Sequence, residues 1–192
     1  MFKAAVLLFF VSTQALAQHG DAPSTRTAPP EAKQFAFLIG QFDLTVRPAV
    51  TGLAAKIHGV PKLVGTWKGW RAMDGFGVVD ELRVTDESGN PRLLANAVRF
   101  YDASQKRWIS QNIDVYRGVA NSSSGEWKGD AIVLISHGTD AEGKVYLVRG
   151  RYSEITPTSF KFRQERSYDE GKTWEDGVLE IEAKRVAATA TR

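Results

Sequence analysis

The chain has 192 residues, with 25 basic and 22 acidic side chains that give a net charge of +3. This length is sufficient for one domain with a substantial core. The charges are interspersed, which argues against a nucleic acid or an acidic membrane surface as partner. Cysteine is absent, which excludes disulfides and a thiol nucleophile.

Residues 1–17 have the pattern of a secretory signal peptide. Lys3 supplies the positive start, residues 4–11 are apolar, and a small-x-small cleavage site ends at Ala17. The apolar run is shorter than the ~20 residues that span a bilayer, so no membrane span is expected. The pattern predicts a periplasmic or secreted protein after cleavage following Ala17. Residues 18–30 are rich in Pro, Ser, Thr and Ala and predict a flexible linker.

One short helix is predicted over residues 31–39. Pro30 suits its first turn. Phe35, Leu38 and Ile39 fall on one face, at helical spacing, so this helix is expected to pack on an apolar surface.

From residue 41 onward the pattern is that of β-strands. Ten are predicted, at 41–49, 61–73, 77–85, 92–101, 107–116, 118–128, 130–136, 144–153, 158–168 and 174–185. Turn residues separate them, and the longer connection 51–59 could cover one end of the sheet. Such a series either stacks as two sheets or closes, and because closure leaves no exposed strand edge, an all-β, antiparallel up-and-down barrel of about 8–10 strands is predicted. The barrel domain would span residues 31–186, followed by a flexible tail at 187–192.

A tight hairpin is predicted at the last turn, where the sequence reads Ser167-x-Asp169-x-Gly171-x-Thr173-Trp174. This octamer resembles the Asp-box of sialidase-type β-propellers. A propeller needs several blades, and the chain holds one copy without an internal repeat. A structural turn is therefore predicted, with Asp169 accepting backbone hydrogen bonds, Gly171 at positive φ and Trp174 packed on the turn.

Four segments, in order, resemble bacterial lipocalin-like domains of unknown function. They are residues 35–42 (Phe-Ala-Phe-Leu-Ile-Gly-Gln-Phe), 73–81 (Met-Asp-Gly-Phe-Gly-Val-Val-Asp-Glu), 99–108 (Arg-Phe-Tyr-Asp followed by Arg-Trp) and 166–175 (Arg-Ser-Tyr-Asp-Glu-Gly-Lys-Thr-Trp-Glu). The broader group is the calycins, in which a Gly-x-Trp on the first strand packs against a basic residue on the last strand. The resemblance implies that Gly40 and Phe42 pack against Arg185 or Lys184, with Phe42 in place of the tryptophan.

Alternation predicts which side chains point into the barrel. The predicted inward residues are Phe160, Phe162, Gln164 and Arg166; Leu179, Ile181 and Ala183; and Ile109, Gln111, Ile113 and Val115. For the strand 144–153 both faces stay open. Trp67 and Trp70 lie an odd distance apart and are expected on opposite faces, one in the core and the other at a cavity or rim.

Seven residues are candidates for contacts with a ligand in the lumen: Trp70, Glu81, Arg99, Gln111, Arg149, Gln164 and Arg166. An arginine inside a barrel favours a carboxylate or another planar anion, bound bidentately. The alternative is that these polar groups pair internally, with Asp80, Glu81 or backbone carbonyls. We expect the lumen to bind a small, partly apolar or anionic molecule.

Two other functions stay open from the sequence: an enzyme, such as a hydrolase or isomerase, using the same lumen, and a domain for contacts without a ligand. No pair of base and nucleophile is visible, so no catalytic residue is predicted. Asp80 and Glu81 are adjacent on a strand and face opposite sides, which does not suit two-carboxylate glycoside hydrolysis. No metal site is predicted, and haem bound through His137 is the one cofactor considered. The oligomeric state is not indicated.

Overall fold

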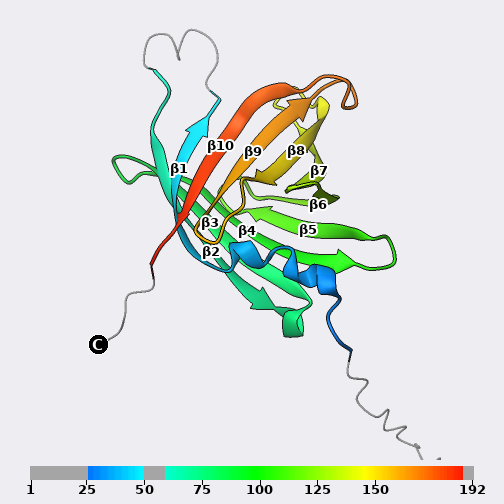
Figure 1. Cartoon of the computed structure of the whole chain (residues 1–192). Helices are drawn as coiled ribbons and strands as arrows, with labels where there is room; N and C mark the ends of the chain where they lie inside the picture. The colour runs from blue at the N-terminus through cyan, green and yellow to red at the C-terminus, as the bar shows by residue number, and fades with distance from the viewer. Residues whose placement is uncertain (1–25, 50–58, 188–192) are drawn as a thin grey trace, which may run out of the picture.

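Ten β-strands make up most of the described chain, which covers residues 26–49 and 59–187 of the computed structural model (Figure 1). The strands are β1 (Gly40–Pro48), β2 (Leu63–Ala72), β3 (Gly77–Asp86), β4 (Pro91–Asp102), β5 (Arg107–Asp114), β6 (Val119–Lys128), β7 (Ala131–Thr139), β8 (Val145–Ser153), β9 (Ser159–Ser167) and β10 (Glu175–Arg185). Each pairs antiparallel with its sequence neighbours, and β1 also pairs with β10. The predicted closed antiparallel barrel is confirmed.

Several predicted segments fall outside the described residues. They are the signal peptide at 1–17, the linker up to residue 25, the connection from 51 to 58 and the tail from 188.

The short N-terminal helix that the sequence predicts is present, as two consecutive 3-10 helices, η1 (Pro30–Lys33) and η2 (Ala36–Leu38). Phe35 separates them with backbone angles outside the helical region. A helix of nine residues is marginal on its own, so docking decides the local geometry. The predicted packing is nevertheless confirmed, because Phe35 and Leu38 are fully buried. No helix among the described residues has the length and apolarity to cross a membrane.

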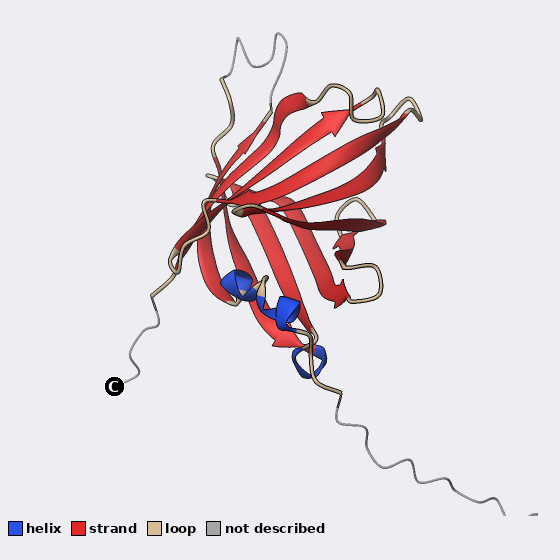
Figure 2. Ribbon diagram, turned by 45° about the vertical axis from the view of Figure 1, so that its right-hand side comes forward, coloured by secondary structure: helices blue, strands red, loops and turns tan. Residues whose placement is uncertain are grey.

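The η1–η2 segment closes one end of the barrel, as Figure 2 shows in blue beneath the strands. Phe35 meets the Trp108 ring edge-on, with centroids 4.6 Å apart. The Trp108 indole N–H donates to Gln34 Oε1 at 2.8 Å. The Leu38 carbonyl approaches β2 so closely that a Cβ on Gly69 would lie 2.2 Å from it. Glycine at position 69 therefore allows the segment to seat as a plug.

The predicted contact between the first and last strands is also present. The Arg185 guanidinium lies over the Phe42 ring, 4.5 Å from its centroid. Arg185 also donates to the carbonyls of Ile39 and Phe37, at 2.6 and 3.0 Å. A Cβ on Gly40 would collide with this guanidinium at 2.3 Å. One side chain thus ties the plug to both strands of the barrel seam.

The inward faces of β9 and β10 are as predicted, with Phe160 and Ile181 buried in the core. The predicted face of β5 is wrong. Trp108 and Ser110 are the buried residues of this strand, whereas Ile113 is 51% exposed. Trp108 turns inward because its ring packs on the plug, and the pairing then fixes the parity of the whole strand.

Candidate ligand sites

On β7 to β10, the inward face of the barrel changes from buried to partly exposed with distance from the plug. On β9, Phe160 is 2% exposed. Phe162, Gln164 and Arg166 follow on the same face and are all partly exposed. Partly exposed inward residues also occur on β7, β8 and β10, namely Ser136, Tyr146, Val148 and Leu179. Solvent therefore reaches the inward side chains of β7 to β10 at the end opposite the plug, whereas Val46 on β1 and Val84 on β3 are buried, at 1% and 3% exposure.

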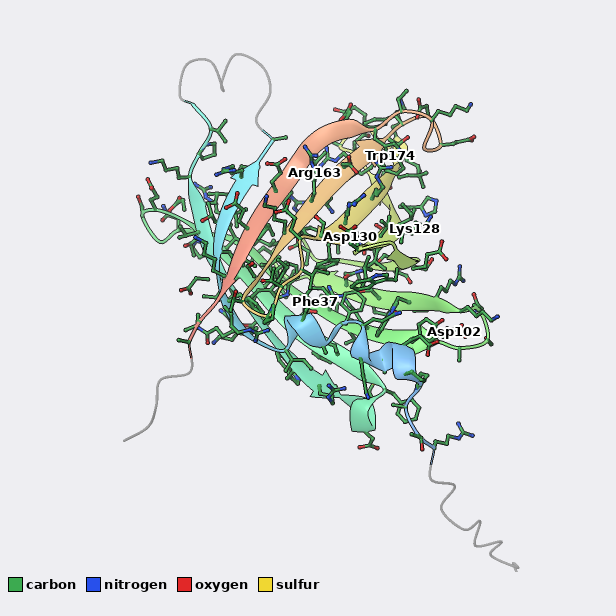
Figure 3. The ribbon with its side chains drawn as sticks, viewed as in Figure 1. Phe37, Asp102, Lys128, Asp130, Arg163 and Trp174 are labelled. Atoms are coloured by element: carbon green, nitrogen blue, oxygen red, sulfur yellow. The ribbon has the colours of Figure 1, made fainter. Side chains whose placement is uncertain are left out.

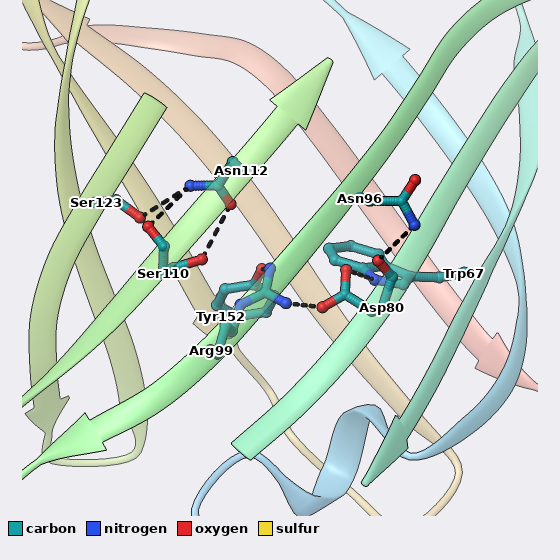
Figure 4. A network of polar contacts seen from close by, with 8 residues as sticks. All are labelled: Trp67, Asp80, Asn96, Arg99, Ser110, Asn112, Ser123 and Tyr152. Carbon is teal, nitrogen blue, oxygen red and sulfur yellow. Dashed lines mark hydrogen bonds and ion pairs between the residues drawn. The ribbon is translucent and has the colours of Figure 1, made fainter. Parts of the chain in front are cut away.

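A buried ion pair lies between the plug and this open part of the lumen (Figure 4). Asp80 and Arg99 are 2% and 3% exposed and form a direct salt bridge. Trp67 donates its indole N–H to Asp80 Oδ1 at 2.8 Å, and Arg99 donates to the Tyr152 hydroxyl at 3.0 Å. Burial raises the pKa of Tyr152, and the charge of Arg99 opposes that rise. Arg99 is inside as predicted, but its charge is balanced by Asp80, the alternative that the sequence kept open.

A second polar cluster lines the wall formed by β5 and β6, and sequence reasoning missed it. Ser110 donates to Asn112 Oδ1 at 3.0 Å, and Asn112 Nδ2 donates to the hydroxyl of Ser123 at 3.3 Å (Figure 4). The miss follows from the inverted face of β5. The signal that could have found it is the pairing of Ser110 with Arg99, which places both on one face.

Four side chains gather at the open end and are called the mouth cluster: Lys144, Tyr146, Arg166 and Tyr168. The Arg166 guanidinium lies over the Tyr146 ring at 5.0 Å, and the Lys144 ammonium lies over the Tyr168 ring at 4.7 Å. The two tyrosine rings are 5.3 Å apart. Within the described chain no carboxylate forms an ion pair with Arg166. Arg166 is therefore a cation that faces the lumen and is available to an anion.

Four of the seven predicted lumen residues lie on the outer wall instead: Trp70, Glu81, Gln111 and Arg149. Trp70 is 46% exposed, because its neighbour Trp67 turns inward to reach Asp80. Glu81 pairs with Arg83 at 2.6 Å. Gln111 follows the corrected face of β5 and bonds to Ser122.

Arg149 faces outward because Tyr152, on the same strand with opposite parity, fills the core. Arg99, Gln164 and Arg166 are thus the three predicted residues that face inward.

His137 is exposed, on the outer face of β7, where it cannot ligate a haem iron in the lumen. His137 therefore does not fit the role of axial ligand that the sequence left open for it. Within the described residues no three His, Cys, Asp or Glu side chains come together in a way that would hold a metal ion.

A groove of about 880 Å³ runs along the outer wall, over β6 to β9. Its basic lining residues are Lys106, Arg107, Lys128, Arg149, Arg151 and Arg163. Figure 3 labels Lys128 at the end of β6, Arg163 on β9 and Trp174 in the β9–β10 turn. We call this surface the outer groove. Sequence reasoning missed it, since charged residues alternating along a strand are typical of any solvated face.

The β9–β10 turn holds Trp174 at one end of the outer groove. Asp169 accepts from the Thr173 backbone N–H at 2.9 Å and from its hydroxyl at 2.6 Å. Gly171 has φ +86° and accepts the Trp174 indole N–H at 3.0 Å. The structural interpretation of the Ser167–Trp174 octamer is confirmed. Hydrogen bonds from Thr173 and Ser167 lower the pKa of Asp169 to about 2.

We expect Asp169→Asn to lower the melting temperature at neutral pH and to lose this effect in acid. A depressed pKa means that the carboxylate stabilises the fold above the ordinary aspartate pKa of about 4, and that this stabilisation disappears as the pH falls toward about 2. Thermal melts of the variant and the parent across this range measure the difference. Asp43→Asn, on the exposed face of β1, serves as control. A difference for Asp169→Asn that stays constant down to the lowest pH would contradict the assignment.

Comparison with known proteins identifies no family for this chain. No protein-family model matches it, and no curated protein does. Among solved structures, one described as EF1p2_mFAP2b bound to DFHBI superposes with a TM-score of 0.40 and 10% sequence identity, over 81% of this chain and 98% of that one. Similarity at this level carries no argument about function.

Proposed function

We propose that this chain is an exported, lipocalin-like binding protein that holds a small, partly apolar anion in the lumen of its barrel. The observation that carries the proposal is the partial exposure of inward side chains on β7 to β10, ending at Arg166, which forms no ion pair with a described carboxylate. The N-terminal pattern supports export after Ala17. The contact of Arg185 with Phe42 supports the lipocalin-like assignment, because it matches the contact that the resemblance implies.

The side chains that face the lumen change from apolar near the plug to cationic at the open end. Phe162 and Leu179 supply apolar walls, and Gln164, which pairs with Leu179 across β9 and β10, supplies an amide. Arg166 lies nearer the mouth, and its stacking on Tyr146 limits the orientations of the guanidinium. An apolar body between the walls with its carboxylate on Arg166 would satisfy all of these groups. Arg99 adds little attraction, because Asp80 balances its charge.

Titration with anilinonaphthalene sulfonate, a fluorescent and partly apolar anion, tests this proposal. We expect saturable binding that Arg166→Gln weakens about tenfold, since a hydrogen bond to a charged group contributes roughly 1.5–3 kcal/mol. Arg47→Gln is the matched control, because Arg47 lies on the outside of β1, away from the lumen and paired with Glu182. Val148→Trp, which fills the lumen from β8, should abolish binding.

Two outcomes would contradict the proposal. One is dye binding that survives both Arg166→Gln and Val148→Trp. The other is dye binding that Arg149→Gln weakens instead, because Arg149 lies in the outer groove. Native mass spectrometry of the protein purified from its own cells would then show whether a small molecule travels with the barrel, and its mass.

A further inference from the structure

The outer groove gathers basic side chains from several neighbouring strands. It is lined by six basic side chains and by two carboxylates, Glu126 and Glu165. Four of these six are in salt bridges: Lys128 with Glu126, Arg149 with Glu165, Arg151 with Asp130 and Arg163 with Glu180. Among the described residues no salt bridge engages Lys106 or Arg107, so the excess positive charge of the groove lies at these two residues and at the loosely paired Arg151. Such a concavity focuses the field on an incoming anion.

Arg149, one of the lining residues of this groove, is held in a fixed geometry. Its Nε donates to Glu165 Oε2 at 2.5 Å, and its guanidinium lies over the Trp174 ring at 4.1 Å. The β9–β10 turn fixes that ring in turn. A guanidinium that is bonded along one edge and stacked on one face still has other N–H groups that can donate. Because the side chain is already ordered, binding of a ligand carboxylate to it costs little further conformational entropy.

The other basic residues are spread along the groove. Lys106 lies in the β4–β5 turn, Arg107 begins β5, and Arg151 lies on β8 beside Arg149. Arg151 is only loosely paired, with Asp130 at 3.9 Å. Cations placed at separate points along an open groove suit an extended ligand that carries several charges, in contrast to a single small ion.

The groove also contains groups that suit hydroxyls. Glu126, Glu165, Ser124 and Ser153 can accept hydrogen bonds from a neutral hydroxyl, whereas the two carboxylates would repel a densely charged polyphosphate. A peptide main chain has no strand to pair with here, because each of the ten described strands is bonded on both sides in the closed barrel. We infer that the outer groove binds a carboxylate-bearing oligosaccharide of the uronic acid type, independently of the lumen.

Isothermal titration with an oligogalacturonate tests this inference. We expect saturable binding that weakens with added salt and at least about tenfold weaker binding of a neutral malto-oligosaccharide of equal length. The double variant Arg107→Gln/Arg151→Gln should weaken the oligogalacturonate about tenfold or more. The control Arg47→Gln/Lys68→Gln removes the same charge from exposed positions outside the groove lining and should bind as the parent does.

Three results would overturn the inference: no saturable binding, equal losses in the groove variant and its control, or tighter binding of an oligoglutamate peptide than of the sugar. The last result would assign the groove to an acidic protein segment. Arg166→Gln should leave oligogalacturonate binding unchanged, which separates the failure of this inference from the failure of the lumen proposal. Circular dichroism and thermal melts confirm that each variant is folded.

Discussion

Replacing Arg99 by methionine is expected to lower the free energy of unfolding by about 3–5 kcal/mol, the usual cost of leaving one buried charge without its partner. The Asp80 carboxylate would remain in the interior with a single hydrogen bond, from the Trp67 indole. The Tyr152 hydroxyl would lose its donor at the same time. Urea denaturation followed by circular dichroism measures the change.

The double variant Asp80→Leu/Arg99→Met separates charge from packing. Because an apolar pair of similar volume needs no desolvation, the double variant should be more stable than Arg99→Met alone, even though the Trp67 N–H loses its acceptor. Arg83→Met, on the exposed face of β3, should cost less than about 1 kcal/mol, as is usual for a surface pair. A single Arg99→Met variant no less stable than the surface control would show that the buried pair is not the determinant of stability assigned to it.

Local sequence patterns were sufficient to predict the strands and their closing turn. Period-two alternation and turn residues are properties of neighbouring positions, so they can be recognised in the sequence before the partner strand is known. The Ser167–Trp174 octamer is the clearest example, since every hydrogen bond that defines it joins residues within the octamer. The inward face of β9 follows from the same logic, because its outward face is charged at Lys161 and Arg163.

The facing of β5 and β8 could not be predicted from the sequence, because tertiary contacts decide it. β5 carries Ile109 and Ile113 on one face and Trp108 and Ser110 on the other, and hydrophobicity alone favours the first. Packing of Trp108 against Phe35, which lies far away in the sequence, selects the second. A shift of the strand by one residue moves every side chain from the inward face of the barrel to the outward face, and the reverse.

The candidate sites were partly predictable for the same reason. Arg166 and Gln164 belong to a strand with an unambiguous outer face, and both point inward as expected. Arg149 was only a candidate for the lumen, because the sequence left both faces of its strand open. It lies in the outer groove, where its partners Glu165 and Trp174 come from later parts of the chain. No local pattern indicates a groove that four neighbouring strands and two turns form together.

The two proposed sites share a wall and use its two faces. On β9, Gln164 and Arg166 face the lumen, whereas Arg163 and Glu165 line the outer groove. On β8, Val148 faces inward and Arg149 outward. Substitutions one residue apart therefore address different sites, and for this reason each binding experiment can use the other site's variant as its control.

Replacing Phe35 by alanine is expected to destabilise the barrel by about 3–5 kcal/mol, the usual range for removing a buried phenyl ring. Phe35 is 0% exposed and meets the rings of Trp108 and Tyr152 edge-on, at 4.6 and 5.6 Å between centroids. Its ring also lies beneath the Arg99 guanidinium, at 5.4 Å. The cavity would therefore open beside the buried ion pair and loosen the plug that closes this end.

Urea denaturation and the near-ultraviolet circular dichroism of the tryptophans measure this effect together. Phe100→Ala is the matched control, because Phe100 carries the same ring on the outward face of β4 and should cost less than about 1 kcal/mol. Phe35→Leu should recover part of the loss, since it refills most of the volume without the aromatic edge contacts. If Phe35→Ala unfolds at the same urea concentration as Phe100→Ala, packing of the plug does not stabilise the barrel. The assignment of the plug as the closed end of the lumen would then be contradicted.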